Sequence, residues 1–107
     1  MRKEIVVKNR PAMPPVYPGE ILREDVLPAL DISIGSFARS VGVSRQMLHR
    51  ILAGTHGITP EMALRFGKFV GNGPEIWLSM QQAYDLWHAE HDIAVELATI
   101  KPYPKAA

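Results

Sequence analysis

Apolar residues recur along the chain at intervals of three and four, the spacing of a helix that buries one face. Between residues 18 and 27 the apolar positions share such a face: Ile21, Leu22, Val26 and Leu27. Pro18 suits the first turn of this helix because its missing N–H would have no partner there anyway. Pro28 interrupts the pattern, since a proline inside a helix removes a hydrogen bond. We therefore expect a first helix over residues 18–27.

Two shorter helices are expected next, each opened by a serine and closed by a glycine. Ser33 is a typical N-cap, and Gly42 suits the left-handed conformation that ends many helices. Ser44 and Gly54 repeat these signals around the next apolar face. The two faces consist of Ile34, Phe37, Ala38 and Val41, then Leu48, Ile51 and Leu52. Because so few residues separate the two helices, they must meet at a steep angle.

The rest of the chain predicts two more helices. Thr59–Glu61 combines an N-cap, a first-turn proline and a first-turn acid, and the helix that it opens ends at Gly71. Pro74–Glu75 opens a longer helix, whose apolar pattern extends to Leu97. Outside Ile5–Lys8 no run alternates as a strand would. The chain is therefore expected to be all-α, with an N-terminal arm over 1–14, a helical domain over 15–100 and a tail over 101–107.

The segment Ser33–Gly54 has the residues that a helix-turn-helix requires. A small residue, Ala38, allows the second helix to pack across the first, and Gly42 allows the sharp turn between them. Apolar side chains on both helices then hold the angle: Phe37, Val41, Val43, Leu48 and Ile51. The alternative is a helical hairpin with merely solvated polar side chains. The agreement of small residue, glycine, cap and apolar positions favours the helix-turn-helix.

Charge is segregated along the chain, although the net charge is only +1. Residues 32–60 contain no carboxylate but carry Arg39, Arg45 and Arg50. Residues 71–100 contain five carboxylates and neither Lys nor Arg. A polyanion would be attracted to the first region and repelled by the second.

The residues of the predicted second helix of this motif suit contact with DNA bases. Arg45, Gln46, His49 and Arg50 fall on the side opposite its apolar face. Arg45 and Gln46 lie in the first turn, the part of a recognition helix that reaches base edges in the major groove. Arginine can donate two hydrogen bonds to guanine, and glutamine can exchange two with adenine. Candidate phosphate contacts are Ser44, Arg39, Arg50 and Thr55.

Aromatic and methionine side chains form a stripe along one side of the last predicted helix: Trp77, Met80, Tyr84 and Trp87. Such a stripe is often core. A domain this small cannot bury every face, however, and two Trp and a Tyr on an acidic helix make a reasonable dimer or partner surface. We therefore assign all four as candidate dimer or partner contacts, with a place in the core as the alternative.

Enzymatic chemistry has little support in the residues. The chain has no Cys, which excludes a thiol nucleophile, a disulfide framework and a Cys-ligated metal. His88 and His91 stand three apart, but no third ligand follows at a suitable spacing, so a solvated acidic helix end is favoured over a metal site. We expect no cofactor, no metal and no catalytic residue. The lack of a signal-peptide-like or membrane-length apolar run favours a cytoplasmic protein without membrane contact.

Three segments together carry a resemblance to a known family: YPGEILREDVLPAL, FARSVGVSRQMLHRILAG and GITPEMALRFGKFVGNGPEIWLSMQQAYDLWHAE. They resemble the HigA-type antitoxins of bacterial toxin–antitoxin modules, from about Met13 to Glu90. The resemblance implies a five-helix Xre/Cro-like (lambda-repressor-like) helix-turn-helix DNA-binding domain with a C-terminal extension helix. It also implies a homodimer that binds a palindromic operator in double-stranded DNA, represses its own operon and neutralises a RelE-like ribonuclease toxin.

Carried over by position, the expected DNA readers are Ser44, Arg45, Gln46 and His49, with Arg50 and Thr55 nearby. The chain departs from the family at His49, where a small polar residue is common, and at Thr55–His56, where basic residues are common. The alternative function is a stand-alone Xre-family repressor without a toxin. A neighbouring gene for a small basic protein would favour the antitoxin.

Overall fold

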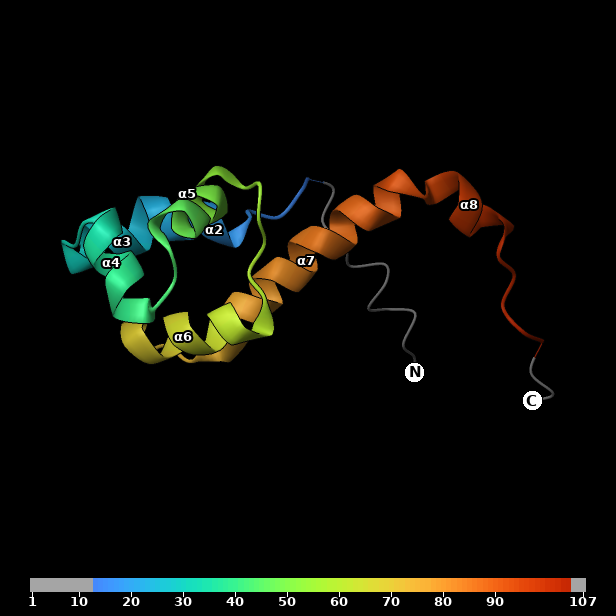
Figure 1. Cartoon of the computed structure of the whole chain (residues 1–107). Helices are drawn as coiled ribbons and strands as arrows, with labels where there is room; N and C mark the ends of the chain where they lie inside the picture. The colour runs from blue at the N-terminus through green and yellow to red at the C-terminus, as the bar shows by residue number, and fades with distance from the viewer. Residues whose placement is uncertain (1–12, 105–107) are drawn as a thin grey trace.

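The computed structural model describes residues 13–104, and within that range it contains helices and no strand (Figure 1). The elements are α2 (Pro18–Ile21), η1 (Leu22–Val26), α3 (Leu27–Leu30), α4 (Ile34–Val41), α5 (Arg45–Ala53), α6 (Pro60–Val70), α7 (Pro74–Asp92) and α8 (Ala94–Thr99). The all-α expectation is confirmed. The alternating run Ile5–Lys8 lies outside the described residues.

The first helix does not end at Pro28, as the sequence predicted, but continues without a break from Pro18 to Leu30. Its middle, η1, is a π-helical turn, in which the Leu27 amide donates to the Leu22 carbonyl. This wider turn precedes Pro28, whose ring would clash with the carbonyl four residues earlier in a regular helix. The helix ends instead at Asp31, which is left-handed with φ 52°. The π turn therefore accommodates the proline.

The short helices begin and end where the sequence predicted. The hydroxyl oxygens of Ser33, Ser44 and Thr59 accept hydrogen bonds from the amides three residues later. Gly42, Gly54 and Gly71 take positive φ values of 76°, 82° and 93° at the C-terminal ends. These caps satisfy backbone groups that a helix terminus leaves without partners.

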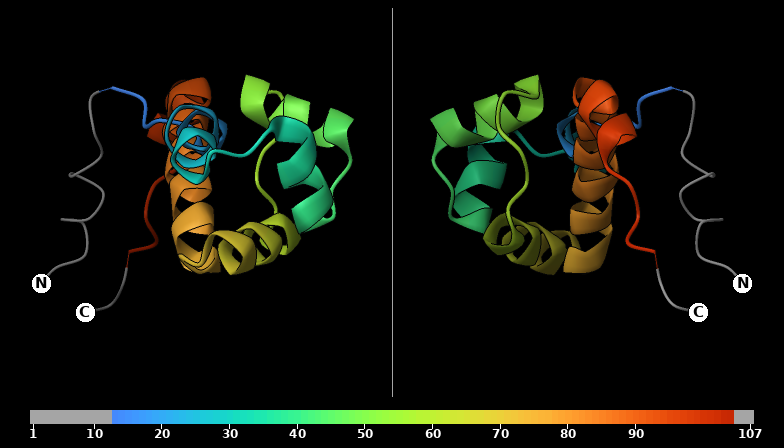
Figure 2. Two further views of the ribbon diagram at one scale, coloured as in Figure 1. Left: turned by 90° about the vertical axis from the view of Figure 1, so that its left-hand side faces the viewer. Right: turned by 90° about the vertical axis from the view of Figure 1, so that its right-hand side faces the viewer.

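One core joins α2 through α6 and the start of α7. Its buried apolar residues are Leu22, Leu27, Phe37, Ala38, Val41, Leu48, Ile51, Leu52, Ile58, Ala63, Phe66 and Trp77. Phe66 lies at its centre, edge-on to Phe37 at 5.3 Å and to Trp77 at 5.6 Å between ring centroids. In end-on view, α6 crosses the base and connects the α4–α5 pair on one side with α7 on the other (Figure 2).

Helix α7 runs beyond this core, and α8 continues outward from its far end (Figure 1). The sequence pattern suggested one helix to Leu97, but the helix breaks at Ile93, where φ is −114° and ψ is 28°. Every residue from His91 to Pro104 is exposed. This extension therefore adds surface and does not contribute to the core.

Gly19→Ala should destabilise the fold by about 1–3 kcal/mol, the usual cost of overpacking. Residue 19 is buried in α2, and a Cβ there would collide with the backbone carbonyl of Ile51 in α5. Gly35→Ala is the matched control, because its Cβ would meet only side-chain atoms, the nearest at 3.7 Å. Urea unfolding should show Gly35→Ala at least as stable as the parent. Equal stability of both variants would contradict this packing.

Candidate nucleic-acid interface

Helices α4 and α5 form the predicted helix-turn-helix, joined by Gly42–Ser44. The amides of Gly42 and Val43 both donate to the carbonyl of Ala38, at 2.9 and 3.1 Å. Gly42 adopts the left-handed conformation that this turn requires, and the small side chain of Ala38 is buried. The turn is therefore closed by backbone bonds that a larger residue at 38 or 42 would disturb.

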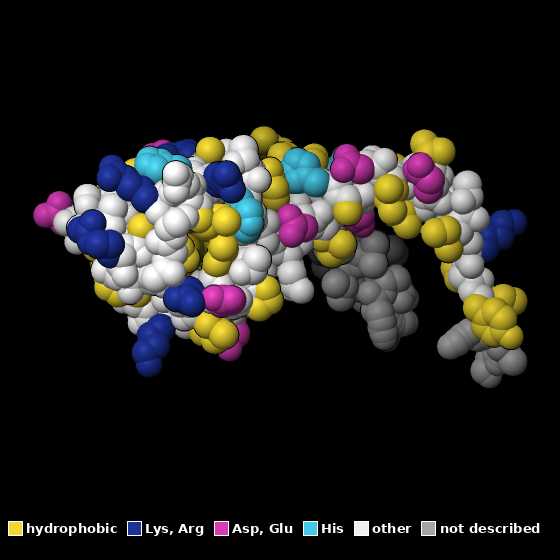
Figure 3. Space-filling model, in the orientation of Figure 1, with side chains coloured by type: hydrophobic (Ala, Val, Ile, Leu, Met, Phe, Trp, Pro, Cys, Tyr) yellow, Lys and Arg dark blue, Asp and Glu magenta, His cyan; other side chains and the backbone are white. Residues whose placement is uncertain are grey.

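The first turn of α5 faces outward. Arg45, Gln46, His49 and Arg50 are all exposed, whereas Leu48, Ile51 and Leu52 on the opposite face are buried. In Figure 3 most of the Lys, Arg and His side chains visible on this face lie over the end of the molecule built by α4 and α5. The structure thus brings the predicted base-reading residues together on an accessible surface.

Arg39 on α4 and Arg45 on α5 converge on Gly35. A Cβ built at Gly35 would lie 3.7 Å from an Nη1 atom of each guanidinium. Arg39 also donates to Ser36 Oγ at 3.1 Å, and among residues 13–104 neither arginine forms an ion pair with a carboxylate. Two neighbouring cations repel each other, so an anion bound between them would be stabilised. The sequence predicted DNA contacts for both residues but did not indicate that their guanidinium groups lie close together.

The remaining predicted polar residues differ in what they can offer. Ser44 Oγ accepts from the Met47 amide at 3.0 Å, which leaves its hydroxyl proton available to another acceptor. Thr55 Oγ1 instead donates to the Arg50 carbonyl at 3.3 Å, so its proton is already used. His56 Nδ1 lies 2.7 Å from the Gly57 carbonyl and must carry the donated proton, since a carbonyl only accepts. Thr55 is therefore a weaker phosphate donor than the sequence suggested.

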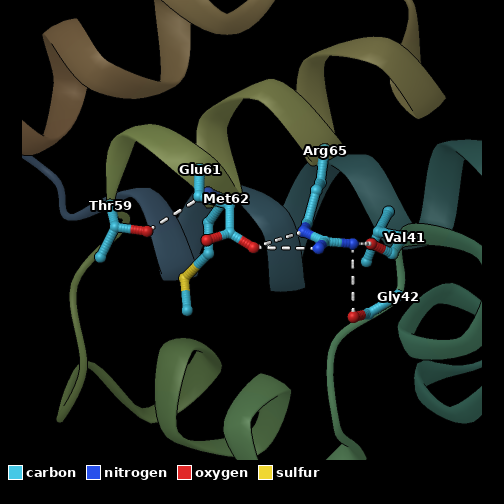
Figure 4. Close-up of polar contacts among 6 residues, drawn as sticks. All are labelled: Val41, Gly42, Thr59, Glu61, Met62 and Arg65. Carbon is cyan, nitrogen blue, oxygen red and sulfur yellow. Dashed lines mark hydrogen bonds and ion pairs between the residues drawn. The ribbon is translucent and has the colours of Figure 1, made fainter.

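Arg65 on α6 reaches the turn of the motif and bonds its backbone (Figure 4). Its Nη1 donates to the carbonyls of Val41 at 3.0 Å and Gly42 at 3.4 Å. Its Nε and Nη2 donate to Glu61, one helical turn earlier, at 3.1 and 2.9 Å. Sequence analysis missed this role, although the four-residue spacing of Glu61 and Arg65 was a visible signal.

The end of α5 is held in a similar way. Arg23 Nη1 donates to the Leu52 carbonyl at 2.7 Å, and the Tyr17 hydroxyl donates to the same oxygen at 3.2 Å. Hydrogen bonds to Glu24 and then to Tyr17 raise the pKa of Arg23 above its ordinary value, so the group stays cationic. The orientation of α5 is thus set by residues outside the motif.

The predicted partner stripe on α7 divides between core and surface. Trp77 is 0% exposed and donates its indole N–H to Asn72 at 3.0 Å, so its assignment to an interface was wrong. Met80 is half-buried against the core, and Tyr84 packs edge-on to Tyr17 at 5.7 Å. Trp87 stacks on His91 at 3.7 Å. The pattern could not separate these roles, because α7 leaves the core partway along its length.

Exposed apolar side chains continue along α7 and α8: Ile76, Leu86, Ile93, Val95, Leu97 and Ile100. Several hydrophobic side chains along these helices are visible in Figure 3. Within the described residues, 13–104, no group of three or more His, Asp or Glu is arranged to hold a metal ion. No helix there is both long and apolar enough to cross a bilayer.

The fold and the outward first turn of α5 define an all-helical helix-turn-helix protein. No family model matches the chain. Virulence-associated protein I of Dichelobacter nodosus is 41% identical over 75% of this chain and 74% of its own length. Antitoxin HigA-1 of Vibrio cholerae is 32% identical over 82% of this chain and 83% of its own. The solved Pseudomonas aeruginosa antitoxin HigA with higBA promoter has a TM-score of 0.77 at 32% identity, covering 82% and 97% of the two chains.

These similarities extend over most of both chains. The chain belongs to the family of HigA-type helix-turn-helix antitoxins. The resemblance inferred from its sequence segments is confirmed.

Arg65→Ala should lower the free energy of unfolding by about 1–2 kcal/mol, because the part-buried Val41 carbonyl would lose a charged donor. Lys68→Ala is the control, since the Lys68 side chain is an exposed cation on the same helix and forms no hydrogen bond with residues 13–104. Thermal and urea unfolding of the two variants would be compared. Equal stability would show that Arg65 is not needed to hold the turn.

Proposed function

We propose that this protein binds operator DNA through the first turn of α5. One observation carries the proposal: Arg45 and Gln46 face solvent there, with Arg39 beside Arg45, in a segment that has no carboxylate. This arrangement suits a recognition helix in the major groove. The similarity to a HigA antitoxin solved with its promoter supports it.

Each exposed residue has a chemical role in the proposed complex. Arg45 can bind guanine O6 and N7 together, and Gln46 can pair with adenine N6 and N7. His49 lies one turn further along and reaches a base or a phosphate. Arg39, Arg50 and the Ser44 hydroxyl contact backbone phosphates, with a smaller contribution from Thr55. These phosphate contacts orient the protein on the duplex without specifying sequence.

The protein would act as a homodimer on a palindromic operator. One modest basic face per protomer provides little affinity, whereas two faces joined by a dimer contact adjacent half-sites about 34–36 Å apart. Leu86 and its apolar neighbours along α7 and α8 offer the surface for this dimer, together with the exposed part of Trp87. A patch of this kind is rarely left open on a monomer.

We further propose that the protein is an antitoxin that represses its own operon and neutralises a RelE-like ribonuclease toxin. Membership of the HigA-type family supports the antitoxin role. The role of a stand-alone repressor is the alternative. Co-expression with the neighbouring gene product, followed by purification and a gel shift on the upstream DNA, separates the two functions.

Gln46→Ala should relax operator specificity at one position per half-site and cost about 1–3 kcal/mol of binding free energy there. Arg39→Ala should instead weaken binding to all DNA sequences alike. It should also reduce the slope of log affinity against log salt concentration by about one for each phosphate no longer bound, hence about two per dimer. Fluorescence anisotropy on a set of single-base operator variants distinguishes the two effects. If both variants lost only non-specific affinity, α5 would not be the recognition helix.

Leu86→Asp should shift the protein from dimer to monomer, because it replaces an apolar side chain that is 44% exposed on α7 with a charged one that the dimer would have to bury. Leu64→Asp is the control: Leu64 is 61% exposed but lies on α6, away from the proposed contact. Sedimentation velocity at micromolar protein concentration would measure the oligomeric state of both variants. A dimer unchanged by Leu86→Asp would exclude this face.

A further inference from the structure

The turn between α5 and α6 is held by a side chain from α7. The amide of Ile58 donates to Gln81 Oε1 at 2.7 Å, a bond between residues 23 positions apart. Gln81 is only 9% exposed, although it is polar. In Figure 1 the segment that connects α5 to α6 descends alongside α7. A buried amide without its acceptor would cost free energy, so this bond constrains the path of the turn.

Asp85 determines which way the Gln81 amide points. Gln81 Nε2 donates to Asp85 Oδ1 at 2.9 Å, one helical turn further along α7. Because a carboxylate can only accept, it draws the NH₂ group toward itself and leaves the amide oxygen facing Ile58. The pair therefore acts as an oriented acceptor and not as a glutamine free to flip.

The turn lies directly against this pair. A Cβ built at Gly57 would lie 2.9–3.2 Å from the three amide atoms of Gln81, which is too close for a side chain to fit without displacement. Gln81 also lines a surface pocket of about 230 Å³ together with Thr55–Gly57, Tyr17 and Tyr84. Within residues 13–104, Gln81 is therefore the side chain that bonds the backbone of this turn from α7.

We propose that Gln81, oriented by Asp85, is a positioning residue for operator binding. It holds the turn that carries Thr55 and His56, directly after the proposed recognition helix. The Leu52 carbonyl at the end of α5 is already held by Arg23 and Tyr17, and Gln81 supplies the second attachment on the other side of Gly54. The inference rests on the proposed function, since it concerns the same DNA-binding surface.

Gln81→Met tests the attachment, because methionine has a similar length but cannot accept the Ile58 amide strongly. Operator affinity should fall about tenfold, because without this bond only about one free molecule in ten would hold the turn in the DNA-binding position. The probe is a duplex from the region upstream of the chain's own gene, measured by anisotropy at a temperature where circular dichroism shows every variant folded. Leu64→Met is the control, because it places the same side chain on the exposed side of α6, away from the proposed dimer contact, and it should bind as the parent does.

Gln81→Glu gives a signature that a purely structural role would not produce. At high pH the new carboxylate faces Asp85 and is repelled by it, whereas at low pH a protonated Glu can donate to Asp85 and still accept from Ile58. The affinity of Gln81→Glu, divided by that of the parent at the same pH, should therefore rise as pH falls from 8 to 5.5. The other titratable groups around the pocket are His56, Tyr17 and Tyr84, and the ratio to the parent removes their common contribution.

The outcomes separate the two proposals. If the parent binds the upstream duplex and Gln81→Met binds equally well, the positioning role is wrong while the proposed function stands. A pH-independent ratio for Gln81→Glu would also overturn the positioning role, and it decides the matter if Gln81→Met fails to fold. Failure of the parent to bind that duplex would overturn both proposals together.

Discussion

Backbone groups at the ends of α4 and α5, and in the turn after α5, have no partners within a helix, and side chains from the flanking segments bind them. Three such attachments surround the motif: Arg65 to Val41 and Gly42, Arg23 with Tyr17 to Leu52, and Gln81 to Ile58. Helices of eight and nine residues are too short to be stable alone. The direction in which the first turn of α5 points is therefore a property of the whole domain.

The same arrangement separates charges in space. The carboxylate-free segment lies at the end formed by α4 and α5, while the acidic residues after Gly71 belong to α7 and α8, which extend the other way (Figure 1). A polyanion can approach the first end without meeting the second. The convergence of Arg39 and Arg45 beside Gly35 increases the positive potential at that end, since neither guanidinium group forms an ion pair with a carboxylate among residues 13–104.

Capping serines and terminal glycines could be read from the sequence because their effect is local. Ser33, Ser44 and Thr59 each bond an amide three residues away, which depends on nothing else in the fold. Pro28 was misjudged, since a π turn in the preceding residues absorbs the strain that a regular helix could not. Trp77 was misjudged for a different reason: helical periodicity shows which residues share a face, but not where along its length a helix leaves the core.

The order of the helices, the ends of α4, α5 and α6 and the outward residues of α5 were determined by the sequence alone, because hydrogen-bond caps and apolar spacing act over a few residues. Tertiary structure alone decided that Arg65, Arg23 and Gln81 hold the motif, since each bonds a backbone group 23 to 29 positions away. No local pattern encodes such a pairing. It exists only once burial of Phe37, Phe66 and Trp77 in one core has brought α2, α6 and α7 around α4 and α5.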